Sequence, residues 1–353
     1  MKYRIHLLAL PNVQTTMAYS LCGFCVATIR FAKLLKELGH EVILYASEEN
    51  EAPCDELVTV ITKEEQKVLL DGIDYQYAAM FNRGLPLWSL SNNRTIVEIG
   101  KRKRKRDFLL TIGGTSQEPV ANAHPDLMTV EYSIGYMSQF AKYRVYESHC
   151  WRAWSTASTG GVDGRFFDEV IPLFFDETEF EFRPHKEPFA LYVGRLIPKK
   201  GLTIACQAAQ AAGIPLKVIG HGDPSLVTHG AEYLGALNDK ERNSHMSRAS
   251  ALLCPTIYIE PFGSVAVEAQ LCGTPVISTD FGGFVETVEH GKTGFRCSYL
   301  GQFVNGLKNA PKLDPFYIRQ RAVEKYSLHN LKHDYQRYFD RLSLLWDAGW
   351  DTI

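Results

Sequence analysis

The sequence predicts an α/β protein built from two parallel-sheet domains. A strand–helix–strand pattern opens the chain, and the same pattern starts again near residue 188. A length of 353 residues fits two domains of about 150 residues each. With 45% hydrophobic and 12% aromatic residues, each half can bury its own core, which excludes a disordered or collagen-like chain.

The first domain begins with a short apolar run at residues 5–10, which is typical of a strand buried on both faces. A helical pattern follows and ends at Gly39, and residues 41–47 form the next strand pattern. A strand, a helix and a second strand in this order predict a βαβ unit with parallel strands and a right-handed crossover.

The second domain repeats this alternation. Strand patterns lie at 189–193, 215–220, 251–255 and 275–279, and helical patterns at 203–212, 238–250 and 265–271. Gly213 ends the first of these helices, and Asn238 caps the second. We therefore expect domains at 1–172 and 173–330, joined by the Pro-flanked acidic stretch 171–188. Apolar residues at helical spacing between about residues 314 and 346 predict one or two amphipathic helices near the C-terminus.

Charge and hydropathy exclude several classes of protein. Lys and Arg number 38 against 40 Asp and Glu, so the whole chain is not a basic nucleic-acid binder. No run approaches the ~18 apolar residues of a transmembrane helix, and the N-terminus does not fit a signal peptide. Eight cysteines, mostly in apolar runs, favour reduced thiols in a cytoplasmic enzyme. Cys22 and Cys25 form a CxxC, which we interpret as two small residues on a packed helix face.

Residues 192–201, YVGRLIPKKG, follow directly on a strand. Gly194 allows the backbone to turn sharply, and Arg195 and Lys200 project from the loop that leads to the next helix. Two cations at this place suit a diphosphate, although exposed basic loop residues would give the same pattern.

Residues 260–269, EPFGSVAVEA, form a second motif. Glu260 lies in the loop after a strand, and Gly263 and Ser264 open the next helix. The N-terminus of that helix offers N–H groups and a positive dipole end to a phosphate. Glu268 lies one turn beyond Ser264 on the same face. Two carboxylates therefore flank the predicted phosphate site and can accept hydrogen bonds from sugar hydroxyls.

These motifs together resemble the retaining glycosyltransferases of family 4. The residues that carry the resemblance are GRLIPKKG, the E-x7-E of Glu260 and Glu268, YLG at 233–235, GTPVIST at 273–279, and GG-x-x-E-x-V-x-x-G-x-x-G at 282–294. The resemblance implies the GT-B fold, with two Rossmann-like domains facing across a cleft and the donor held mainly by the C-terminal one. It also implies that residues 331–353 form a C-terminal helix packing back on the N-terminal domain.

The resemblance further implies a nucleotide-diphosphate sugar as donor, with a UDP-sugar favoured, and a role for each matching residue. Arg195 and Lys200 would contact the diphosphate, Glu260 the hydroxyls of the transferred sugar, and Glu268 the ribose. Further contacts to sugar and phosphate would come from the residues that open the helix, Phe262, Gly263, Ser264 and Val265. The chain has no Asp-x-Asp motif, and two cations with a helix end can stabilise a leaving diphosphate, so we expect metal-independent transfer with no cofactor.

The acceptor side carries weaker signals. Gly23 stands where the family often has a Gly-Gly pair, His124 corresponds to a family histidine that touches the transferred sugar, and Glu131 would bind acceptor or serve a structural role. Segments 130–136 and 143–151 look like a subgroup signature to which the sequence assigns no role.

The six cations of Lys101–Arg106 leave the identity of the acceptor open. They form either a solvated surface loop or a contact for a phosphate-rich acceptor. The acceptor is then a sugar, a small molecule or a hydroxymethylated base flipped out of DNA. A sugar-nucleotide epimerase and a non-catalytic sugar-nucleotide binder are the alternatives from other functional classes.

Overall fold

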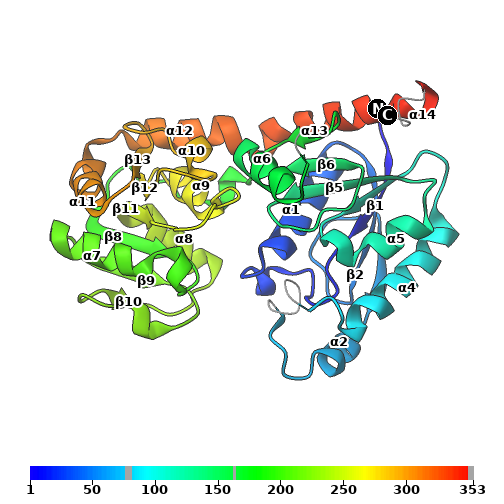
Figure 1. Ribbon diagram of the computed structural model, residues 1–353, viewed down its shortest axis with the longest axis horizontal. Helices are drawn as coiled ribbons and strands as arrows, with labels where there is room; N and C mark the ends of the chain where they lie inside the picture. The colour runs from blue at the N-terminus through cyan, green and yellow to red at the C-terminus, as the bar shows by residue number, and fades with distance from the viewer. Residues whose placement is uncertain (76–81, 162–163, 349–353) are drawn as a thin grey trace. The chain divides into compact units, whose positions relative to one another are not determined.

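The computed structural model of the chain describes residues 1–75, 82–161 and 164–348. The chain divides into two compact units (Figure 1). Unit 1 comprises Met1–Glu147, Ser158–Ile171 and Lys332–Ile353, and unit 2 comprises Ser148–Ala157 and Pro172–Leu331. The segment Ser148–Ala157, which the sequence analysis assigned to the first domain, thus belongs to unit 2 by its contacts. Residues 349–353 of the expected C-terminal helix lie outside the described residues.

Unit 1 contains a parallel sheet of seven strands in the order β3-β2-β1-β4-β5-β6-β7. The strands are β1 (Arg4–Leu8), β2 (Glu41–Ser47), β3 (Glu56–Ile61), β4 (Phe108–Thr111), β5 (Met128–Ile134), β6 (Tyr143–Tyr146) and β7 (Glu169–Val170). The helices include α1 (Gly23–Glu37), α2 (Lys63–Leu70), α4 (Pro86–Arg102), α5 (Glu118–Ala123), most of α13 (Leu328–Ser343), and α14 (Leu345–Ala348). The strand order reverses between β1 and β4, and open α/β sheets bind ligands at the carboxyl ends of such a strand pair.

Unit 2 contains a parallel sheet of six strands in the order β10-β9-β8-β11-β12-β13. The strands are β8 (Glu187–Val193), β9 (Leu216–Ile219), β10 (Glu232–Tyr233), β11 (Ala249–Cys254), β12 (Val276–Thr279) and β13 (Gly294–Cys297). The helices include α6 (His149–Ser158), α7 (Leu202–Ala212), α8 (Asp239–Arg248), α9 (Ser264–Leu271), α10 (Phe284–Thr287), α11 (Leu300–Asn309) and α12 (Pro315–Tyr326). The order reverses between β8 and β11. The predicted α/β class with two parallel sheets is confirmed.

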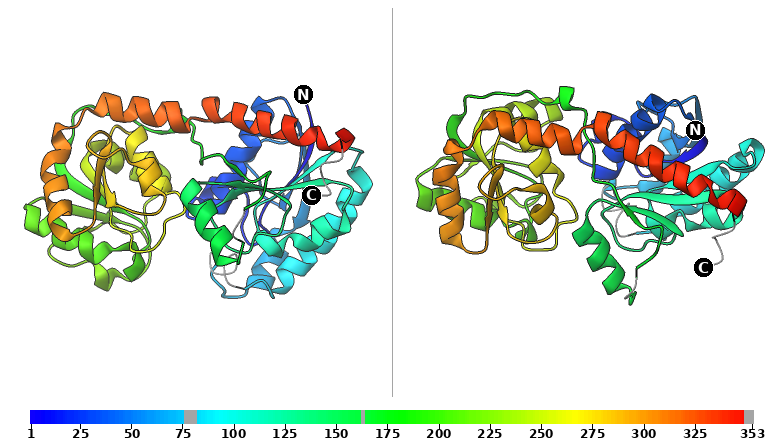
Figure 2. Two further views of the ribbon diagram at one scale, coloured as in Figure 1. Left: turned by 45° about the horizontal axis from the view of Figure 1, so that its top comes forward. Right: turned by 90° about the horizontal axis from the view of Figure 1, so that it is seen from above.

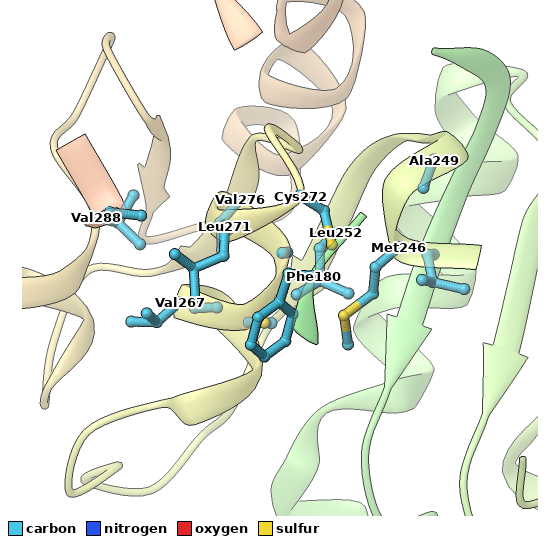
Figure 3. Packing of buried hydrophobic residues seen from close by; sticks show 14 of the residues in the cluster. Phe180, Met246, Ala249, Leu252, Val267, Leu271, Cys272, Val276 and Val288 are labelled. Carbon is cyan, nitrogen blue, oxygen red and sulfur yellow. The ribbon is translucent and has the colours of Figure 1, made fainter. Parts of the chain in front are cut away.

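The stretch 171–188, expected to be a linker, contributes to the core of unit 2. Phe175 and Phe180 are only 0% and 3% exposed, although acidic residues surround them in the sequence. Figure 3 shows Phe180 among core residues such as Met246 and Leu271. The stretch is therefore not a free tether, because burial of two aromatic rings fixes it on unit 2.

Most of the C-terminal helix α13 lies along unit 1 (Figure 2). Aromatic side chains anchor it there. Tyr335 meets the ring of Phe31 edge-on, with 4.8 Å between the ring centroids. Phe339 is fully buried, and its ring lies 5.2 Å from Phe108 and 6.5 Å from Tyr3. These contacts attach α13 to α1, to β4 and to the residue before β1.

All eight cysteines are free thiols. Cys22 and Cys25 are buried, and the Sγ of Cys25 points to the carbonyl oxygen of Gln14 at 3.4 Å, so the CxxC packs as small residues. Among the described residues, no group of His, Cys, Asp and Glu side chains is arranged to hold a metal ion. The same part of the chain includes no helix of the length and apolarity needed to cross a membrane.

The aromatic anchor of α13 leads to a stability prediction. Replacing Phe339 by Ala is expected to lower the free energy of unfolding by about 3–5 kcal/mol, because a buried ring is lost and a cavity remains. The control is Leu344→Ala, which removes a side chain that is 61% exposed and is expected to change stability by less than about 0.5 kcal/mol. Urea unfolding measures both, and equal losses would contradict the anchoring role.

Candidate functional site

The loop after β8 carries the first group of predicted residues. Gly194 directly follows the strand, and the side chain of Arg195 is exposed. Lys200 precedes Gly201, which has a φ of +74° and lies so close to the loop after β11 that a Cβ would sit 1.9 Å from the carbonyl oxygen of Pro255. Only glycine allows this approach, which brings the two loops together at the carboxyl ends of β8 and β11.

Lys200 and Glu260 form an ion pair between these loops. The distance from Nζ to Oε2 is 2.6 Å, and the side chains are 20% and 13% exposed. Lys200 Nζ also lies 5.1 Å from the ring centroid of Tyr258. Burial alone would lower the pKa of the Lys200 ammonium, but Glu260 and Tyr258 together outweigh this effect and the pKa is raised. The group is therefore a stable cation, and an ammonium has three N–H donors, so it can bind an anion while keeping Glu260.

The next residues of the chain open α9. Phe262 is buried, and Gly263 is the N-cap with a φ of +87°, where a Cβ would lie 2.6 Å from Cε1 of Phe284. Ser264 and Val265 form the partly exposed first turn. The first N–H groups of a helix have no acceptor within the helix, and the dipole makes this end positive. The turn is therefore suited to a phosphate.

The loop after β12 packs against the same loop through Gly282 and Gly283. A Cβ at Gly282 would lie 2.8 Å from the nitrogen of Glu260, and one at Gly283 would lie 2.7 Å from the Cα of Phe262. The N–H of Gly283 donates to the carbonyl oxygen of Glu260 at 2.7 Å. The glycine pair thus fixes the main chain that carries the Glu260 carboxylate.

Glu268 is buried on α9 and faces Arg242 of α8. Nη2 of Arg242 lies 3.4 Å from Oε2 of Glu268, and its Nη1 lies 3.0 Å from Oδ1 of Asp239. The Glu268 carboxylate raises the pKa of Arg242. Sequence reasoning missed Arg242, because α8 is polar on most of its surface and its pattern does not indicate which residue meets α9.

Glu131 and Gly23 both lie in unit 1, but their surroundings differ. Glu131 is fully buried in β5, and its carboxylate accepts from the N–H groups of Phe140 and Ala141, both at 2.8 Å, and from the hydroxyl of Tyr136 at 3.2 Å. Burial raises the pKa of this carboxyl group. These bonds favour the structural role for Glu131.

Gly23 opens α1 after β1, at the edge where open α/β sheets generally bind ligands. A Cβ at Gly23 would meet nothing within 4 Å.

His124 lies at the other edge of the unit 1 sheet, because it precedes β5 in the chain. It is 5% exposed, and its Nε2 lies 3.0 Å from the carbonyl oxygen of Ile96. Burial lowers the pKa of the ring. This placement gives His124 a structural contact and does not support the expected contact with a sugar.

The basic run Lys101–Arg106 precedes β4 and also lies at the amino-terminal edge of the unit 1 sheet. Four of its cations pair with carboxylates: Lys101 with Glu98 at 2.6 Å, Arg102 with Glu56 at 2.7 Å, Lys103 with Asp126 at 2.5 Å, and Arg104 with Glu41 at 3.8 Å. These pairs neutralise much of the charge. The run is thus a surface segment of mixed charge, which weakens the case for a DNA acceptor.

Comparison with solved structures defines the fold. The chain superposes on a glycosyltransferase involved in avilamycin A biosynthesis with a TM-score of 0.72 and 21% identity, covering 97% of this chain and 98% of that chain. This chain has the GT-B fold. The UDP-glucose complex of Anabaena HepE gives a TM-score of 0.67 at 17% identity, with 97% and 100% of the two chains covered.

Sequence comparison confirms the resemblance to glycosyltransferases. Residues 175–299 match the family described as "Glycosyl transferases group 1". D-inositol 3-phosphate glycosyltransferase of Rhodococcus erythropolis is 36% identical over 124 residues, which is 29% of this chain and 28% of that protein. Glycogen synthase of Mycobacterium tuberculosis is 29% identical over 223 residues, or 53% of each chain. The matched part thus spans about half or less of these curated relatives.

The tight packing at Gly263 can be tested by substitution. Gly263→Ala and Gly213→Ala both place a side chain at a positive φ, which costs about 1–2 kcal/mol, but a Cβ at Gly213 would meet nothing within 4 Å. We expect Gly263→Ala to lose about 1–3 kcal/mol more in urea unfolding, because its Cβ overlaps Phe284. Equal losses would show that the contact with Phe284 relaxes without cost.

Proposed function

We propose that the chain is a glycosyltransferase that moves a sugar from a nucleotide-diphosphate sugar, bound by unit 2, to a hydroxyl group of an acceptor. The observation that carries this proposal is the Lys200–Glu260 pair, which joins the loop before α7 to the loop before α9. A fixed cation and a helix N-terminus match a diphosphate, and the carboxylates match the hydroxyls of the sugars on either side of it. The family match over residues 175–299 supports the proposal, because it spans both motifs.

Each of these residues has one task in the proposed reaction. Arg195 and Lys200 bind the diphosphate together with the first turn of α9. Negative charge develops on the leaving phosphate as its bond to the anomeric carbon breaks, and these fixed charges stabilise it. Glu260 accepts hydrogen bonds from hydroxyls of the transferred sugar, and Glu268, held by Arg242, accepts from the ribose hydroxyls.

We further propose that the donor is a UDP-hexose and that transfer proceeds with retention at the anomeric carbon. Anabaena HepE, which shares the fold, is described in complex with UDP and with UDP-glucose, and this supports UDP. Retention rests on the resemblance to family 4. The leaving phosphate then accepts the proton of the acceptor hydroxyl, and Glu260 is not a nucleophile.

The proposed acceptor is a sugar or another small molecule, because carboxylates pair with the basic run that would have favoured DNA. The proposed transfer needs no metal ion, since Arg195, Lys200 and the α9 terminus supply positive charge to the diphosphate. A cytoplasmic location is proposed as well, and the eight free thiols support it.

Replacing Lys200 by Ala tests the diphosphate assignment. Loss of a fixed charge that stabilises the leaving group is expected to lower kcat for UDP-glucose turnover by about 10²–10³-fold. The control is Lys199→Ala, because Lys199 is an exposed lysine next to it and is expected to leave kcat within about 2-fold. Thermal unfolding checks that both variants fold, and wild-type turnover by a folded Lys200→Ala protein would refute the assignment.

Metal removal tests the proposed source of positive charge. Turnover of UDP-glucose in an excess of EDTA, roughly 5–10 mM, is expected to equal turnover with added Mg²⁺ or Mn²⁺ within about 2-fold. Product formation can be followed by chromatography of released UDP. Loss of activity in EDTA that is restored by Mg²⁺ would contradict metal independence and leave the donor assignment intact.

A further inference from the structure

The opening of α6, residues 148–150, is held by hydrogen bonds to a side chain and a main-chain carbonyl of unit 2. Oε1 of Glu286 accepts from the N–H of Cys150 at 2.8 Å, and Oε2 accepts from the N–H of His149 at 3.0 Å. The hydroxyl of Ser148, which is 1% exposed, donates to the carbonyl oxygen of Pro261 at 2.5 Å. This segment lies within 143–151, to which the sequence assigned no role.

These contacts link the opening of α6 to the loop that carries Glu260 at two points. Glu286 lies on α10, whose preceding residue Gly283 donates its N–H to the carbonyl oxygen of Glu260 at 2.7 Å. Pro261, the acceptor for Ser148, is the residue after Glu260 and is 113 positions away from Ser148 in the sequence. The opening of α6 therefore bonds to α10, which is linked to Glu260 through Gly283, and to the main chain of the loop at Pro261.

We propose that Glu286 and Ser148 are positioning residues for Glu260 and that the opening of α6 acts as a brace for the loop that holds the transferred sugar. This inference rests on the proposed function of Glu260. The loop lies outside regular structure, and Pro261 has no N–H of its own with which to anchor it. The brace is strong because a carboxylate that accepts two N–H groups of a helix opening forms charge-assisted bonds.

The proposal predicts a specific loss in Glu286→Ala. A displacement of about 1 Å in a positioned group can cost about 10²-fold in rate, so we expect kcat for UDP-glucose to fall by at least about 10-fold. The Kd for UDP should change by less than about 3-fold, because UDP lacks the transferred sugar that Glu260 contacts and its diphosphate is bound by Arg195, Lys200 and the first turn of α9. Ser148→Ala should behave in the same way, and Glu286→Gln, which keeps one acceptor oxygen, should lie between Glu286→Ala and the wild type.

The matched control is Asp314→Ala. Asp314 also caps a helix of unit 2 with its carboxylate, accepting from the N–H of Phe316 at 2.9 Å at the start of α12. Asp314→Ala should lower the melting temperature by a similar amount to Glu286→Ala, and both its kcat and its Kd for UDP should stay within about 2-fold of the wild-type values. A kcat in folded Glu286→Ala equal to that of Asp314→Ala would overturn the proposal.

Hydrogen exchange of the unliganded chain separates the brace from the proposed function. Glu286→Ala should speed exchange in peptides covering residues 259–262 and 282–287 by at least about 10-fold, and Asp314→Ala should not. Unchanged exchange in Glu286→Ala would overturn the brace whatever the protein binds. If the wild-type chain neither binds UDP nor turns over UDP-glucose, the proposed function fails, while faster exchange in Glu286→Ala would still support the brace.

Discussion

The carboxyl edge of the unit 2 sheet depends on backbone contacts that leave no room for a side chain. A Cβ at Gly201 would lie 1.9 Å from the oxygen of Pro255, and one at Gly220 would lie 1.9 Å from the oxygen of Gly194. The loops after β8, β9 and β11 therefore lie backbone against backbone. This close approach lets the long side chain of a lysine on one loop reach a carboxylate on another, so the charge arrangement follows from a steric constraint.

Much of the fold followed from periodicity and capping residues. The strand pattern at residues 41–47 coincides with β2, Gly213 ends α7 with a φ of +71°, and Asn238 caps α8 in a full capping box. The proximity of Lys200 and Glu260 was also predictable, because the carboxyl ends of parallel strands meet at one edge of a sheet and both residues follow strands. Local patterns were sufficient wherever residues close together in the sequence determine the structure.

The remaining features depend on contacts between residues far apart in the sequence. The pairing of Arg242 with Glu268 joins two helices, and the contact of Glu286 with the opening of α6 spans 136–137 positions. The run Lys101–Arg106 forms a stretch of uncompensated charge in the sequence, yet its pairs include residues as distant as Glu41. The stretch 171–188 reads as a linker by composition, and only the tertiary fold shows that its aromatic rings are buried. No local pattern determines such partners.

The most direct test is a structure of this chain with UDP bound. The proposed donor site predicts diphosphate oxygens within hydrogen-bond distance of Nζ of Lys200 and of the first-turn N–H groups of α9, and ribose hydroxyls at the carboxylate of Glu268. A diphosphate bound away from the carboxyl ends of β8 and β11, with Lys200 still paired only with Glu260, would contradict the proposed site.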